Sequence, residues 1–200
     1  MSTKWIKGAL ALALTGVVAG CGGPVDGKPT TGGPSSDSAT PDDLHGAPNI
    51  ANPLKVDKFI KHPCAVISDQ QKESLTSSIQ LPSTGKESAI EGLSNDCQWS
   101  GGGNNATVGL QFLQGGGGLS YIYAQRKELP VFEERPPIEG YPVLHEAQNK
   151  ELPGDCRLVV GVSNHQAIVA SYTGGTGDVE PCDAATKLAT AAVQTLKAAS

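Results

Sequence analysis

The chain has 200 residues and a formal charge of −5, from 15 lysines and arginines against 20 aspartates and glutamates. Nucleic acids and anionic lipid headgroups attract basic surfaces, so this acidic balance argues against both as electrostatic partners. The roughly 150 residues from Asn52 onward are enough for one globular domain with a hydrophobic core.

The N-terminal residues 1–20 have the pattern of a secretory signal peptide. Lys4 and Lys7 precede an uncharged run over 8–18, and small residues follow it. The run is too short to cross a bilayer, which needs about 20 apolar residues. Removing the segment also removes the two lysines, so the formal charge changes from −5 to −7.

Val18-Ala19-Gly20-Cys21 resembles the lipobox of bacterial lipoproteins. The resemblance implies that the Cys21 thiol receives a diacylglycerol group and that the chain is cut before this residue. Acyl chains on Cys21, of the palmitate type, then anchor the protein at the outer face of the cell membrane. Stable anchoring requires more than one acyl chain, which such an anchor supplies. An ordinary signal peptide with an incidental cysteine is the alternative interpretation.

Residues 21–51 are expected to form a disordered linker behind the lipidated cysteine. The segment is rich in glycine, proline, serine, threonine and aspartate, so it buries too little apolar surface to offset its ordering entropy. A linker of this length has a typical reach of roughly 30 Å. His45 lies within it and is interpreted as incidental, not as a ligand.

The remaining residues, 52–200, are interpreted as a single globular domain. A short helical turn follows Asn52-Pro53, and a helix begins after Ser68, whose spacing to Gln71 matches a capping box. This helix is expected to end near Leu75, and a loop over 77–95 is expected after it.

Strand and helix patterns alternate along the rest of the domain. Apolar residues at alternate positions predict strands, and a final helix begins at Pro181 with an apolar stripe at helical spacing. Strands are expected over 97–100, 105–114, 141–147, 156–162 and 166–172, with a helix over 119–129 after the second. The order α-ββ-α-βββ-α predicts an α+β fold, in which helices cover an antiparallel sheet of about five strands.

Four cysteines remain after Cys21, and export would place them in an oxidising compartment, where an even number indicates disulfides. No two of them form a CxxC pair, which argues against a zinc site. Cys64 and Cys182 each follow a proline at the start of a helical segment, whereas Cys97 and Cys156 lie in strand-like segments. Of the three possible connectivities, we therefore expect Cys64–Cys182 and Cys97–Cys156.

A set of short segments lies in a characteristic order along the domain: NPLKVDKFIKHPC, CQWS, EGYPV, CRLVVGV and EPC before an alanine-rich helix. In this order they resemble an uncharacterised family of actinobacterial lipoproteins with a domain of unknown function. The resemblance extends from Asn52 to Ala198. It implies export, lipid anchoring, two disulfides and an α+β sheet, and it implies no catalytic residue.

Few residue patterns indicate catalysis. Ser83 and Lys86 match the S-x-x-K motif of penicillin-recognising enzymes, but the companion S-D-N and K-T-G elements are absent. The histidines lack metal-ligand spacing, and the expected disulfides leave no cysteine for nucleophilic catalysis. A non-enzymatic protein without cofactor or metal is therefore favoured. A serine hydrolase that acts on cell-envelope material is the alternative.

The best candidate for a binding surface is the connection 132–142, which holds the apolar residues Phe132, Ile138 and Tyr141. Apolar residues in a long connection can rim a groove. The sequence therefore predicts a membrane-anchored extracytoplasmic binding or interaction module, whose partner is an envelope protein or a small ligand.

Overall fold

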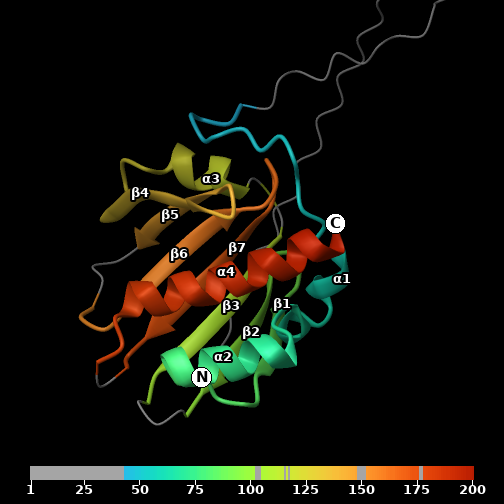
Figure 1. Ribbon diagram of the computed structural model, residues 1–200. Coiled ribbons are helices and arrows are strands. Elements are labelled where there is room, and N and C mark those ends of the chain that lie inside the picture. Colours follow the sequence, from blue (N-terminus) through green and yellow to red (C-terminus); the bar gives the residue numbers. More distant parts are fainter. Residues whose placement is uncertain (1–42, 102–104, 115, 117, 148–151, 176–177) are drawn as a thin grey trace, which may run out of the picture. The chain divides into compact units, whose positions relative to one another are not determined.

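The computed structural model describes residues 43–101, 105–114, 116, 118–147, 152–175 and 178–200 (Figure 1). The signal peptide, Cys21 and the linker up to residue 42 lie outside the described residues, so the interpretations of these segments stay predictions. No helix within the described ranges is long and apolar enough to cross a membrane.

An antiparallel sheet of seven strands forms the centre of the domain, in the spatial order β1-β2-β3-β7-β6-β5-β4 (Figure 1). The predicted α+β fold is confirmed, although the sheet has two strands more than the five expected. The strands are β1 (Lys86–Ile90), β2 (Ser94–Ser100), β3 (Thr107–Leu113), β4 (Val131–Ile138), β5 (Tyr141–Ala147), β6 (Cys156–Gly161) and β7 (Ala167–Thr173).

The two strands that the sequence patterns miss, β1 and β4, form the two edges of the sheet. Every residue of β1 is exposed, so the strand lacks the apolar alternation of a half-buried one. β4 contains three charged residues and two prolines, and its register with β5 shifts between Arg135 and Ile138. Sheet edges tolerate charges, prolines and bulges. The loops predicted over 77–95 and 132–142 are therefore wrong where these strands lie.

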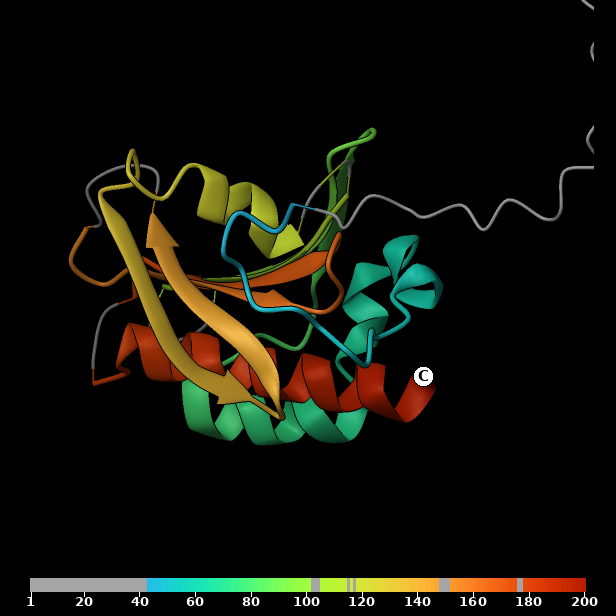
Figure 2. The ribbon, with the colours of Figure 1, turned by 90° about the horizontal axis from the view of Figure 1, so that it is seen from above.

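Helices cover the two faces of the sheet unequally. α4 (Pro181–Ala199) and α2 (Asp69–Ile79) lie on one face, whereas α3 (Gly118–Ala124) lies on the other (Figure 2). The predicted capping box is confirmed, since Ser68 accepts from the Gln71 N–H and the Gln71 side chain accepts from the Ser68 N–H. Two short elements, α1 (Asp57–Ile60) and the 3₁₀ helix η1 (Pro63–Val66), precede α2.

The main core lies between the sheet and α4. Alternate residues of β3, Val108, Leu110 and Phe112, are buried together with Leu188 and Val193 of α4. α4 is rich in alanine, whose small side chain lets the helix approach the sheet closely. A smaller apolar cluster lies beneath α3 on the opposite face. The face that carries α3 therefore has the thinner cover.

Residues 43–51, which the sequence assigns to the linker, lie on the domain. Leu44 and Ala47 pack against the cluster beneath α3. The backbone N–H of Ile50 donates to Oδ1 of Asn164 at 2.9 Å. Leu44, Ala47 and Ile50 supply the apolar surface that the preceding glycine- and proline-rich stretch lacks, which explains why the chain packs here.

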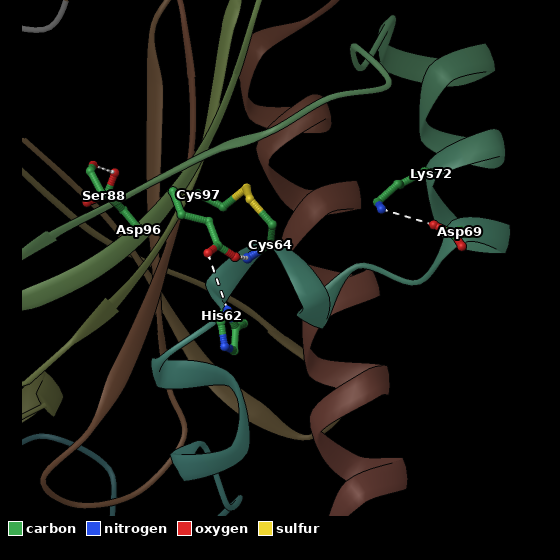
Figure 3. Close-up of a disulfide and its surroundings, with 8 residues drawn as sticks. His62, Cys64, Asp69, Lys72, Ser88, Asp96 and Cys97 are labelled. Carbon is green, nitrogen blue, oxygen red and sulfur yellow. Dashed lines mark hydrogen bonds and ion pairs between the residues drawn. A yellow bond between two sulfur atoms is a disulfide. The ribbon is translucent and has the colours of Figure 1, made fainter.

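Two disulfides are present as expected, but the expected pairing is wrong. Cys64 bonds to Cys97 (Figure 3), and Cys156 bonds to Cys182. The prediction joined helix starts to each other and strands to each other. In the structure η1 packs against β2, and α4 packs along β6, so each bridge joins a helix start to a strand.

The pairing leads to a direct expectation for the exported protein. A non-reduced proteolytic digest is expected to yield one peptide pair that contains Cys64 and Cys97 and another that contains Cys156 and Cys182. The loops that these bridges close span 33 and 26 residues. Each closure stabilises the fold by about 3–4 kcal/mol on the chain-entropy view. Recovery of a Cys64–Cys182 peptide pair would contradict the structure.

Candidate functional site

The residues that the sequence nominates for binding are not brought together. Ile138 and Tyr141 are buried in the main core, and the Tyr141 hydroxyl donates to the Asn52 carbonyl at 2.9 Å. Phe132 belongs to the other cluster, where its ring meets that of Tyr123 edge to face at 5.1 Å. The three side chains pack within the fold and do not rim one groove.

Tyr141 also lines a surface hollow of about 450 Å³ beside residues 49–52. The charged groups there satisfy one another, because the Lys197 ammonium lies 3.1 Å from the Glu139 carboxylate and the Gln194 amide donates to the same carboxylate. The hydrogen bond from Gln194 and the neighbouring Lys197 lower the pKa of Glu139. Because these charged and polar groups are exposed and already paired with one another, few of them are available to bind a ligand.

The serine–lysine motif is not arranged as catalysis requires. Ser83 is exposed in the connection between α2 and β1, and Lys86 is the first residue of β1. The motif needs its serine at a helix N-terminus. The structure therefore gives the hydrolase alternative no geometric support.

The histidines lie in separate parts of the fold. His62 Nδ1 is 3.5 Å from a carboxylate oxygen of Glu87 (Figure 3), and His45 lies in the segment before α1. His145 lies within 4.8 Å of the sulfur atoms of Cys156 and Cys182. These sulfur atoms form a disulfide, so they are not thiolate ligands for a metal.

A hollow does occur on the face of the sheet that carries α3. Between α3 and the adjoining ends of β2 and β3 lies a pocket of about 260 Å³. It is lined by Leu93, Ser94, Gln111, Leu113, Tyr121, Ile122, Gln125, Leu129, Glu146 and Arg157. A second hollow of about 370 Å³ continues over β1, β2, β3 and β7, and Gln111 and Arg157 line both. We call the two together the α3 trough.

Strand register explains why polar side chains line the floor of the α3 trough over β2 and β3. On β2 the residues that alternate with Cys97 and Trp99 of the main core face away from α4, and they include Ser94, Asp96 and Gln98. Gln98 pairs with Gly109, and Asp96 pairs with Gln111 on β3. Beyond α3 no helix of the described chain covers these positions, and the end of the β1–β2 hairpin extends to the same side as α3 (Figure 2).

Buried polar groups lie in the floor of the α3 trough. Glu146 on β5 is only 3% exposed, and its carboxylate accepts a hydrogen bond from the Arg157 guanidinium on β6. Ser94 is 1% exposed, and its hydroxyl has no hydrogen-bond partner among the described residues. A buried hydroxyl without a partner is uncommon in folded proteins. The floor of the trough therefore contains a buried polar group, the Ser94 hydroxyl, to which the fold itself supplies no hydrogen bond.

Exposed apolar side chains surround the same trough. Among the described residues four large hydrophobic side chains are strongly exposed, and three of them line it: Ile90, Leu93 and Tyr121, at 57, 56 and 59%. The fourth, Leu152, lies elsewhere and is 66% exposed. Clustered exposed apolar side chains with a polar rim are typical of interaction sites, whereas single ones are ordinary surface.

Tyr123, a buried residue of α3, connects this helix to the sheet. Its hydroxyl donates to Oε1 of Glu134 at 2.8 Å, which ties α3 to the edge strand β4. Burial, and then the hydrogen bond to Glu134, raise the pKa of Tyr123 well above its ordinary value of 10.0.

This raised pKa makes stability depend on alkaline pH. Above about pH 10 an unfolded tyrosine loses its proton whereas the folded Tyr123 keeps it, so the free energy of unfolding falls as the pH rises. Between about pH 9 and 11 we expect a steeper fall in the wild type than in Tyr123→Phe, by up to about 1.4 kcal/mol per pH unit. Urea titrations at several pH values measure the two slopes, and parallel slopes would contradict the assignment.

Two charged residues within otherwise apolar strands are a sequence feature that could have indicated the trough. Arg157 and Glu146 are charged residues inside strands that otherwise read as buried, CRLVVGV and YPVLHEA. A charge in such a strand indicates a pair or a functional position. Leu93 and Tyr121 give no such signal, because only the fold shows that they are exposed side by side with this pair.

The fold and the trough define a class: a disulfide-stabilised α+β domain with a partly uncovered sheet face that carries a surface trough. Residues 16–195 match the family described as protein of unknown function, DUF3558, and the chain belongs to this family. The match confirms the domain of unknown function that the resemblance implied. No curated protein and no solved structure matches the chain.

Proposed function

We propose that this protein is an exported, lipid-anchored module that binds a partner or ligand in the α3 trough. One observation carries the proposal: Ile90, Leu93 and Tyr121 line a trough whose floor contains the buried Glu146 carboxylate paired with the half-buried Arg157. Apolar walls with a few convergent polar groups are the usual composition of a binding site.

Binding is favoured over catalysis by the chemistry of the trough. Its polar side chains are mainly glutamines and serines, together with an ion pair whose charges offset each other. In the described part of the chain, Ser83 with Lys86 does not line the trough, and the four domain cysteines are oxidised. We therefore propose no reaction for this site.

The sequence before the domain supports a location at the membrane surface. Cys21 follows a signal-like segment, and the stretch from there to residue 42 is rich in glycine, proline and serine. Such a linker has a root-mean-square reach of roughly 25 Å. A domain held at this distance would meet molecules of the cell envelope at high local concentration.

Site-specific photo-crosslinking in the producing cell tests the proposal for protein partners and small ligands alike. A benzophenone amino acid is placed at Tyr121 in one variant and at Leu152 in another. These positions are similarly exposed, but only Tyr121 lines the trough. We expect a discrete adduct from Tyr121 and none from Leu152. Equal adducts at both positions, or none at Tyr121, would contradict the proposal.

A further inference from the structure

We infer that the α3 trough binds an amphiphile that has an apolar chain and an uncharged, hydroxylated headgroup. This inference rests on the proposed function, since it names the ligand class of the same trough. It depends on the different linings of the two ends, on the character of the polar side chains, and on the way the charges are already paired.

The end of the trough beside α3 is suited to an apolar chain. Its apolar lining consists of Leu113, Ile122 and Leu129, which Leu93 and Tyr121 continue to the surface. Five polar residues line the same hollow: Ser94, Gln111, Gln125, Glu146 and Arg157. The pocket of about 260 Å³ is open, so a chain can enter from solvent without opening the fold. Each methylene group buried there should strengthen binding about fourfold.

The other end of the trough is suited to hydroxyl groups. Besides Arg157, five side chains there can hydrogen-bond with a ligand: Ser88, Asp96, Gln98, Gln111 and Ser171. Amides and hydroxyls both donate and accept hydrogen bonds, and a carboxylate accepts. A ligand hydroxyl also donates and accepts, so a head with several hydroxyls can use this mixed set more fully than a head that only accepts or only donates.

The charges in the trough disfavour an ionic head. The Arg157 guanidinium is already paired with the Glu146 carboxylate, and Asp96 adds a further negative charge. An anionic head would therefore meet the Asp96 carboxylate and an arginine that is already engaged by Glu146. A cationic head would find Asp96, which accepts from the Ser88 hydroxyl at 2.7 Å on an open surface, where an ion pair contributes little.

Calorimetric titration with alkyl compounds of defined headgroup tests the inference. The full-length Cys21→Ser protein is used, so that no acyl group of its own can occupy the trough. The probes are decyl maltoside, decyl sulfate, decyltrimethylammonium and maltose, each below its micellar concentration. We expect decyl maltoside to bind at one saturable site, at least about tenfold more tightly than either charged decyl compound, and maltose to bind much more weakly. Octyl maltoside should lose roughly tenfold or more, as two fewer methylenes are buried.

Variants locate the site without disturbing the core. Leu93→Ser and Tyr121→Ser are exposed positions that line the apolar end, and Leu152→Ser is the matched exposed control. We expect each trough variant to weaken decyl maltoside about tenfold and the control to leave it unchanged. Gln111→Ala should reduce the preference for maltoside over sulfate while keeping the dependence on chain length.

Several results would overturn the inference. Equal affinity for the three decyl compounds would show that the headgroup is not recognised, and tighter binding of a charged one would reverse the assignment. Equal losses in Leu152→Ser and Tyr121→Ser would place the binding elsewhere. If no alkyl compound binds but Tyr121 still gives a crosslinked protein in cells, the ligand class is wrong and the proposed function stands. If neither experiment gives a signal, both fail.

Discussion

Replacement of Cys21 by serine is expected to release this protein from the membrane completely. The serine hydroxyl cannot form the thioether through which a lipobox cysteine receives its diacylglycerol. The described part of the chain contains no helix that could span the bilayer in place of the acyl chains. Metabolic labelling with a fatty-acid analogue, followed by separation of membrane and soluble fractions, should show loss of both the label and the membrane association.

A matched substitution in the linker controls for general effects on export. Ser35→Ala changes a side chain of similar size in the glycine-, proline- and serine-rich stretch and leaves the lipobox intact. It should retain label and membrane association at wild-type level. If Cys21→Ser keeps both, the lipid is not attached at Cys21 and the anchored part of the proposed function is lost. Absence of label in the wild type would instead support an ordinary signal peptide with an incidental cysteine.

Arg157→Met is expected to destabilise the domain by about 3 kcal/mol. Arg157 is the hydrogen-bond donor to Glu146, whose carboxylate is buried in the sheet face and only 3% exposed. Removing the guanidinium leaves a buried charge without its partner, which typically costs 3–5 kcal/mol. Arg157 is itself one third exposed, so water can reach part of the site and the lower end of this range applies. Urea unfolding without reductant measures the difference.

The double variant Glu146→Met with Arg157→Met tests the cause of this loss. Replacing both charged groups by apolar ones of similar length removes the unpaired carboxylate, so most of the stability should return. Full additivity of the two single effects would show that the pair is not coupled. A loss below about 1 kcal/mol in Arg157→Met would place the pair in the class of weak surface ion pairs.

The sequence predicts best where side chains alternate between core and solvent. The α+β class, the capping box at Ser68 and the alanine-rich helix at Pro181 all follow from local patterns, and all are confirmed. The sequence patterns do not predict β1 and β4, because edge strands bury few side chains and so need no apolar alternation. The wrong disulfide pairing has a similar origin, because local patterns identify elements and leave open which elements are neighbours.

The candidate site was less predictable than the fold. Phe132 and Ile138 are six residues apart on β4, a spacing that would place both on one face of a regular strand. The register shift between Arg135 and Ile138 brings Ile138 to the other face, beside Tyr141, so the three residues divide between two clusters. The residues of the α3 trough come instead from six strands, from α3, and from the connections after β1 and α3. Only the strand order places Glu146 and Arg157 beside Leu93 and Tyr121.

A crystal structure of the protein purified from its own producing cells tests the central claim most directly. If the α3 trough is the binding site, electron density for a retained molecule should lie between Tyr121, Gln111 and Arg157, with its apolar part toward Leu113 and Ile122. Density for a bound molecule in the hollow beside Glu139 and Tyr141, with none in the trough, would contradict the account.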